Sequence, residues 1–171
     1  MTPDSPTDEP EVVDEAVDAI ALLSADHEDV KQLFADYEEL VDQGAGSEQR
    51  AGVARQICQA LTAHTVVEEE IFYPAVREVL DDPGLIDEAM AEHAQAKALI
   101  GRLQAQSASD PGYDDIVQSL QEAIEHHVHE EETGMFPMVR GKRLDLHDLG
   151  ERLWQRREEV LADLEVDDGP G

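Results

Sequence analysis

The sequence predicts an all-α protein, an antiparallel up-down-up-down four-helix bundle followed by an additional C-terminal helix. Apolar residues recur at helical spacing over four long segments, and clusters of Gly, Pro, Ser and Asp separate these segments. One motif, a His followed four residues later by a Glu and ten residues later by a Pro, occurs in the second and again in the fourth segment. Four long helices with short connections are typical of such a bundle.

Turn-forming residues give the expected order of the elements. The N-terminus is rich in Pro and acidic residues and is expected to be disordered, as is the last stretch of the chain. The predicted divisions are a disordered acidic N-terminus, the bundle, an extra helix and a disordered tail, at residues 1–11, 12–140, 141–165 and 166–171. The predicted helices of the bundle start near Val12, with a fresh start capped by Ser24, then at Ser47, near Leu85 and after the break at 107–112.

Length and composition set limits on function. A chain of 171 residues is long enough for one domain with a sizeable core. The formal net charge is −29, with 12 Lys and Arg against 41 Asp and Glu, and this disfavours nucleic acid and anionic membranes, whose phosphates are bound by Lys and Arg. The acidity suits either a high-salt cytoplasm or an ordinary acidic protein, and composition does not choose between them.

The expected location is the cytoplasm. No stretch approaches the length of a membrane span, and the acidic N-terminus lacks the basic start and apolar run of a signal peptide. The single Cys58 excludes an internal disulfide and fits a reducing compartment. The sequence does not predict an oligomeric state.

The repeated motif places a metal-ligand pair on each of two helices. His64 and Glu68 form the first pair, and His127 and Glu131 form the second, at a constant offset of 63 residues (64 to 127 and 68 to 131). Positions i and i+4 of a helix lie about 40° apart on the same face, so each pair aims an imidazole and a carboxylate in nearly the same direction. Both pairs lie within apolar stripes, and the second stripe contains Val117, Leu120, Ile124, His127, Glu131, Met135 and Met138.

Two more histidines extend the repeat. His27 precedes the first pair by 37 residues and His93 precedes the second by 34, each on the apolar face of its helix, and the face around His93 contains Ile86, Met90, Ile100 and Leu103. The two halves of the bundle therefore resemble each other, and antiparallel folding brings all six residues to one level of the core. A single buried His is more often a satisfied core residue than a ligand, but two carboxylates buried without a cation would each cost several kcal/mol. We therefore predict a metal site. Its imidazole and carboxylate ligands suit Fe, Mn or Zn.

Other polar residues near the motifs are expected to lie outside the ligand stripe. His126, His129 and His147 are predicted to be surface residues. The off-face acidic residues Glu69, Glu70, Glu130 and Glu132 also point away, although one of them is available as a hydrogen-bond acceptor for a ligand.

The order His27, His64-x-x-x-Glu68, His93, His127-x-x-x-Glu131, with Phe72-Tyr73-Pro74 and Phe136-Pro137 following, resembles the hemerythrin-like (HHE cation-binding) family. The resemblance covers roughly Asp18 to Val139. It implies a non-haem pair of iron ions with an oxo or hydroxo bridge, with Mn or Zn less favoured. By the same resemblance, Glu68 and Glu131 would bridge the irons and the four His would be terminal ligands.

The chain departs from the oxygen-carrying hemerythrins at two points. Those proteins place a second His four residues after the third-helix His, where this chain has Lys97, and they use a His-x-x-x-x-Asp spacing in the last helix. A protonated Lys97 cannot donate a lone pair to a metal, so we expect it to turn aside toward a carboxylate or water and to leave one coordination position open.

Three classes of function follow. The favoured one is redox handling of peroxide, nitric oxide or dioxygen, including a catalase-like or peroxidase-like activity in oxidative stress. The alternative is a module that senses or stores oxygen or iron through a partner. The third is a structural metal, for which zinc would suffice.

Overall fold

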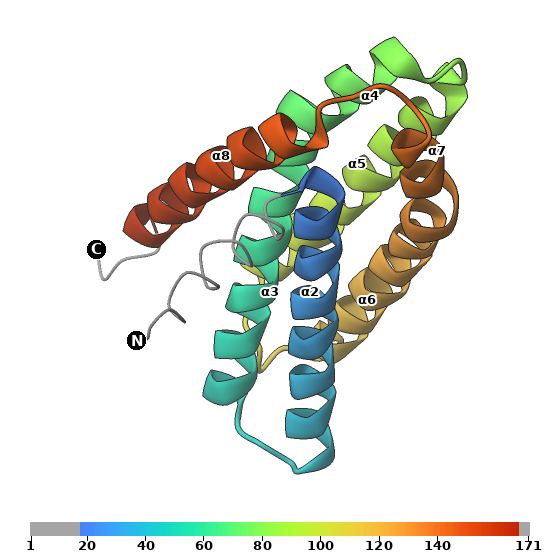
Figure 1. Ribbon diagram of the computed structural model, residues 1–171. Helices are drawn as coiled ribbons and strands as arrows, with labels where there is room; N and C mark the ends of the chain where they lie inside the picture. The colour runs from blue at the N-terminus through green and yellow to red at the C-terminus, as the bar shows by residue number, and fades with distance from the viewer. Residues whose placement is uncertain (1–17, 168–171) are drawn as a thin grey trace, which may run out of the picture.

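The computed structural model describes residues 18–167, and every regular element in that range is helical. Four long helices form an antiparallel up-down-up-down bundle, and the predicted fold class is confirmed (Figure 1). These helices are α2 (Ala19–Asp42), α3 (Ser47–Val67), α5 (Pro83–Ala105) and α6 (Tyr113–Glu130). The remaining elements are η2 (Glu68–Phe72), α4 (Tyr73–Val79), η3 (Glu131–Met135), α7 (Phe136–Arg140) and α8 (Leu146–Asp167).

The first described helix begins at a side-chain cap. Asp18 Oδ1 accepts a hydrogen bond from the backbone N–H of Ala21 at 3.0 Å, which satisfies one of the free donors of the first turn. The predicted helix start at Ser24 is wrong, because Ser24 lies inside α2 and its hydroxyl donates to Glu132 at 3.1 Å. The predicted start near Val12 lies outside the described residues, as do residues 1–11 and most of the predicted tail.

Two π-helical turns interrupt the helices that carry the repeated motif. In η2 the backbone N–H of Tyr73 bonds to the carbonyl of Glu68, and in η3 that of Phe136 bonds to the carbonyl of Glu131. Each turn therefore begins at the Glu of a motif and ends just before the Pro. Because a π turn holds one extra residue, it rotates everything after it relative to a continuous α-helix.

This rotation corrects one prediction about the core. Met138 was expected on the buried face, but it is 42 % exposed, and Phe136 and Val139 are buried instead. Met90, also expected inside, is 37 % exposed because the buried face of α5 at that level consists of Ile86, Ala89 and His93.

The interior has two apolar clusters. The first includes Leu23, Phe72, Val76, Phe136 and Leu153. The second includes Phe34, Ile57, Leu61, Ile100 and Leu120. On α2, α3 and α5, and along α6 with η3 and α7, the buried residues of the two clusters lie on either side of a buried His, so a polar layer separates the clusters.

The C-terminal helix α8 covers one face of the bundle. Figure 1 shows it lying across α2 and α3, against which it packs. Leu149, Leu153 and Val160 are buried in this contact, whereas Trp154 on the outer side is 51 % exposed. Its helical turns begin at Leu146, five residues later than the predicted start at residue 141.

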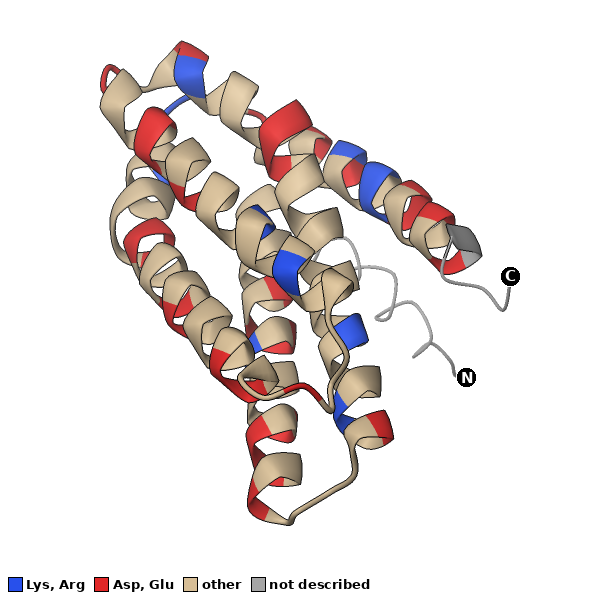
Figure 2. Cartoon of the chain, turned by 180° about the vertical axis from the view of Figure 1, so that it is seen from behind, with Lys and Arg blue, Asp and Glu red and all other residues tan. Residues whose placement is uncertain are grey.

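The charged residues are distributed unevenly. In Figure 2, Asp and Glu occur along the long helices, whereas Lys and Arg are few, and α8 carries Arg152, Arg156 and Arg157. Among the described helices, none combines the length and the apolar character needed to cross a membrane.

Candidate metal centre

Six buried residues of ligand type meet in the polar layer. Each of the six residues predicted from the sequence lies there, with an exposed fraction of 7 % or less: His27, His64, Glu68, His93, His127 and Glu131. They come from α2, α3, η2, α5, α6 and η3, so all four long segments of the bundle contribute. Their ligand atoms form two groups that share Glu68, one with His27, His64 and Glu131 and the other with His93 and His127.

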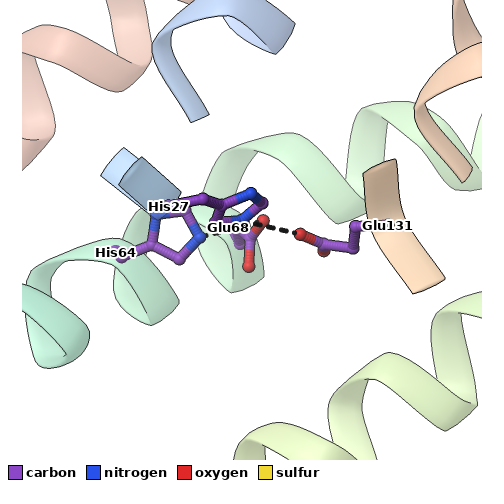
Figure 3. Close-up of side chains that lie close together, drawn as sticks. All are labelled: His27, His64, Glu68 and Glu131. Atoms are coloured by element: carbon purple, nitrogen blue, oxygen red, sulfur yellow. Dashed lines mark ion pairs between the residues drawn. The ribbon is translucent and has the colours of Figure 1, made fainter. Parts of the chain in front are cut away.

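Each carboxylate lies between the two groups. Glu68 Oε2 lies 3.3 Å from His64 Nε2, and Glu68 Oε1 lies 3.0 Å from His93 Nε2. Glu131 likewise has Oε1 at 3.2 Å from His27 Nε2 and Oε2 at 3.3 Å from His127 Nε2. Figure 3 shows Glu131 reaching toward His27, His64 and Glu68 from the opposite side of the bundle. Two carboxylates arranged in this way can each bridge a pair of cations.

The first group has the unsatisfied atoms that a cation would need. His27 Nε2, His64 Nε2, Glu68 Oε2 and Glu131 Oε1 are buried and have no hydrogen-bond partner. Buried polar atoms are rarely left without one, and isolated buried carboxylates are expensive. Two imidazole nitrogens and two carboxylate oxygens fit a divalent or trivalent transition metal, so the residues present suit such an ion.

The Nδ1 atom of each of these four buried histidines is held by a further carboxylate outside the two groups. The Nδ1 atoms of His27, His64, His93 and His127 lie 2.7, 3.1, 2.8 and 2.7 Å from oxygens of Glu132, Asp26, Glu69 and Glu92 respectively. An ionised carboxylate can only accept, so each Nδ1 carries a proton, and each Nε2 faces the centre, where it can donate a lone pair to a metal once it is itself unprotonated. This arrangement is the usual outer support of a histidine metal ligand.

Asp26 and Glu92 were not identified from the sequence, although the repeat contains a signal for them. Each directly precedes the first His of its half and bonds to the second His of the same half. Glu69 and Glu132, each directly after a motif Glu, bond to the first His of the other half. The repeat of the ligands therefore extends to their partners.

Tyr73 is a further polar residue of the centre. Its hydroxyl lies 3.1 Å from Glu68 Oε1, 3.3 Å from His93 Nε2 and 3.4 Å from His127 Nε2, and it donates to Glu131 in a short hydrogen bond. Burial, together with the charges of the two carboxylates, raises the pKa of Tyr73 well above its usual value. The second group therefore includes a phenol oxygen that can hold a proton or, once deprotonated, bind a cation.

Charges within the layer compensate one another. Burial lowers the pKa of His64, but the charge of Glu68 and the hydrogen bond to Asp26 outweigh it and raise that pKa to about 10. The pKa of His127 is raised to about 11, because the pull of Glu131 and Glu68 exceeds the effect of burial. Burial in turn raises the pKa of Glu68, but the charge of His64 opposes it and holds that pKa well below its usual value. Metal ions entering the layer would displace these histidine protons.

Lys97 lies at the edge of the centre. Its side chain is 52 % exposed, and its ammonium donates to Glu69 Oε1 at 2.8 Å, while the other oxygen of Glu69 accepts from His93. Lys97 thus turns aside to a carboxylate and contacts a ligand His only through Glu69.

Of the other histidines, His126 lies near a carboxylate that holds one of the buried histidines. Its side chain is 66 % exposed and lies near Glu92 and Glu130, which form a small surface group with it. His129 and His147 are exposed.

Comparisons with known proteins agree with this geometry. Residues 18–139 match the model of the hemerythrin HHE cation binding domain. The chain is 27 % identical to an HHE cation binding domain-containing protein of Mycobacterium kansasii, whose crystal structure is known. The two structures match with a TM-score of 0.74, over 90 % of this chain and 94 % of the M. kansasii chain. It is also 32 % identical over 119 residues to a DNA nickase of Nostoc sp. (strain PCC 7120 / SAG 25.82 / UTEX 2576). This match covers 70 % of the present chain but only 32 % of the length of the nickase. The buried His and Glu residues and the match over residues 18–139 together show that the chain belongs to the hemerythrin HHE cation-binding domain family.

Proposed function

We propose that the polar layer holds two iron ions and that the protein uses them to react with a small oxidant, with peroxide favoured over nitric oxide and dioxygen. His27 and His64 would bind one ion, His93 and His127 the other, and Glu68 and Glu131 would bridge them. The pairing of each carboxylate with one His of each group supports this assignment.

The observation that carries the proposed substrate class is a small apolar cavity beside the histidines. It has a volume of about 20 Å³, and its lining includes the four ligand histidines together with Val30, Leu61, Ile124 and Val128. A cavity needs roughly 10–15 Å³ to hold one water molecule, so one of this size suits a molecule of two or three non-hydrogen atoms, such as peroxide, and is too small for a larger organic substrate.

The chain's own groups prepare the centre for such a molecule. The four outer carboxylates hold the Nε2 atoms in fixed directions. The apolar wall of Val30, Leu61 and Ile124 keeps bulk water from the histidine side of the layer. The Tyr73 hydroxyl holds a proton next to both bridging carboxylates, where it can be passed to a reduced product. When bound, the iron pair would supply an accessible coordination position and would pass two electrons from one peroxide, which leaves as dioxygen, to a second, which leaves as water.

Metal analysis and peroxide turnover test this function. Protein purified from cells grown with iron is expected to contain two iron ions per chain, to absorb in the visible range and to release dioxygen from hydrogen peroxide. Zinc in the centre with no turnover would contradict the proposal and support a structural metal. Two irons bound reversibly without turnover would instead support the alternative, a sensing or storage module that acts through a partner.

The activity named for the Nostoc relative is not proposed for this chain. The matched region is 32 % of that protein, so its activity can depend on parts outside the match. A net charge of −29 also opposes binding to DNA phosphates.

A further inference from the structure

The C-terminal helix α8 reaches the polar layer through one arginine. The guanidinium of Arg157 donates to Asp26 Oδ1 in a short ion pair, and Asp26 Oδ2 accepts from His64 Nδ1 at 3.1 Å. Asp26 is 8 % exposed and the Arg157 side chain 21 %, so this contact is largely shielded from water. Two hydrogen bonds thus connect a helix outside the four-helix bundle to a ligand of the first metal position.

The other three ligand histidines lack such a connection among the described residues. The outer carboxylates of His27 and His93 contact Ser24 and Lys97, and Glu92, which holds His127, lies near His126. These contacts come from the bundle helices α2, α5 and α6, and Lys97 and His126 are more than half exposed. Among the described contacts, only the support of His64 includes a residue of α8, so the support of the layer is asymmetric.

Arg157 is suited to hold Asp26 in place. A guanidinium stays charged at all working pH values and binds a carboxylate oxygen with directed N–H groups. Removing one partner of a buried ion pair leaves the other charge uncompensated, which is more expensive than losing the pair. Without Arg157, Asp26 would turn toward water, and the Nδ1–H of His64 would lose the acceptor that fixes the direction of its Nε2.

We propose that Arg157 is a positioning residue through which the docking of α8 controls metal retention at the His27 and His64 position, while the His93 and His127 position is independent of α8. This inference rests on the proposed binding of two metal ions. It assigns α8 a role in metal retention beyond covering α2 and α3.

The neighbouring Arg156 provides a matched control. It also joins α8 to a ligand-bearing segment, since its Nε donates to Glu70 Oε1 at 2.9 Å. Glu70 is half exposed, and the described contacts do not connect it to any ligand His. Arg156→Gln therefore removes one positive charge and one contact of α8 but leaves the support of His64 intact.

The test uses four full-length proteins: wild type, Arg157→Gln, Arg157→Lys and Arg156→Gln. Each is titrated with Co²⁺, visible absorption reports the number of ions bound, and chelator competition gives their affinities. Wild type and Arg156→Gln are expected to bind two Co²⁺ per chain with the same pair of affinities. In Arg157→Gln one Co²⁺ should bind as in wild type and the other about 10–100-fold more weakly, the usual effect of losing an outer partner. Arg157→Lys should recover part of that loss, because it restores the charge but not the planar fork.

Two further measurements keep the inference testable if Arg157→Gln folds poorly. The double variant Asp26→Asn with Arg157→Gln removes both charges together, so no buried charge is left alone, and it should still bind one Co²⁺ more weakly. In metal-free protein, the side-chain ¹⁵N spectrum of His64 should show a weaker Nδ1 hydrogen bond in Arg157→Gln or the double variant, but not in Arg156→Gln.

Two outcomes would overturn the inference: Co²⁺ affinities of Arg157→Gln equal to those of Arg156→Gln, or equal weakening of the binding of both Co²⁺ ions in Arg157→Gln. Failure of wild type to bind two Co²⁺ would instead refute the proposed dinuclear centre.

Discussion

Each ligand histidine uses its two ring nitrogens for different tasks. The Nδ1–H of each is fixed by a carboxylate, and Nε2 is thereby directed into the centre. Three consecutive glutamates, Glu68, Glu69 and Glu70, show how sharply this division depends on position, since the first lies in the centre, the second holds His93 and the third pairs with Arg156 on the surface.

Replacing these three glutamates singly by Gln should therefore give a graded loss of metal. Glu68→Gln should weaken binding of both ions most, because a bridging charge is lost. Glu69→Gln should weaken binding about 10–100-fold through His93. Glu70→Gln should leave affinity unchanged and alter stability by about 1 kcal/mol or less, as expected for an exposed ion pair. Chelator competition gives the affinities; an equal loss in Glu68→Gln and Glu70→Gln would show that the carboxylates are wrongly assigned.

Lys97 tests whether an open coordination position matters. Lys97→His places an imidazole four residues after His93 on the same face, where it can become a ligand. The variant should retain metal more strongly and break down peroxide more slowly than wild type. Lys97→Ala removes the partner of Glu69 without supplying a ligand, so it should not gain metal retention. Unchanged turnover and an unchanged visible spectrum in Lys97→His would argue against an open position at this point.

At the scale of the elements, the two π turns change which residues of the motif-bearing helices face the core, because each turn adds one residue. The His of each pair lies before the turn and the Glu is its first residue, and both face the layer. From the last residue of η2 onward the buried residues are Phe72, Tyr73 and Val76, and after η3 they are Phe136 and Val139. The turn η2 thereby directs the Tyr73 hydroxyl toward the centre.

Deleting Thr133 from η3 should convert the π turn to an α turn. The ligands His127 and Glu131 lie before the deletion and keep their direction, but Phe136 and Val139 would rotate out of the core by about 100°. Loss of their burial should lower the free energy of unfolding by several kcal/mol. Deletion of Ser109 in the connection between α5 and α6 is the control and should have a smaller effect in urea unfolding. Equal effects of the two deletions would mean that the extra residue of η3 has no part in packing.

The elements also show what could be predicted from the sequence. Helical periodicity and the duplicated motif were sufficient for the bundle and for the six buried His and Glu residues, because both follow from local spacing, but not for Tyr73 or for Asp26 and Glu92. The π turns and the burial of Phe136 in place of Met138 could not be predicted, since a one-residue change of phase is decided by tertiary packing. Ser24 resembled a cap by residue type, but a better-placed cap at Asp18 had already started the helix.

For the molecule as a whole, the metal-free and metal-loaded forms should depend on pH in opposite ways. The pKa values of His64 and His127 are raised from 6.5 to about 10 and about 11, so their protonated forms stabilise metal-free protein below about pH 6.5, and this stability is lost as the pH rises toward those values. Glu68 and Glu131 have lowered pKa values, so their contribution is present above pH 4.5 and is lost in acid.

Metal-free protein is therefore expected to be most stable between about pH 4.5 and 6.5 and to weaken above that range. Metal competes with the histidine protons, so the loaded form should gain stability over the same rise in pH. Urea unfolding midpoints from pH 5 to 10, with and without metal, measure both trends. Parallel curves for the two forms would indicate that the histidines do not bind the metal.

The polar layer also bears on whether the two ends of the bundle unfold cooperatively. The two apolar clusters meet across histidines and carboxylates, which supply fewer close-packed contacts between the ends of the bundle than a continuous core would. Coordinate bonds from all four helices would join the two ends into one cooperative unit. Without them, the end around Phe34 and Leu120 and the end covered by α8 are free to open separately, each with its own hydrogen-exchange protection. Metal content would then decide whether this chain melts in one transition or in two.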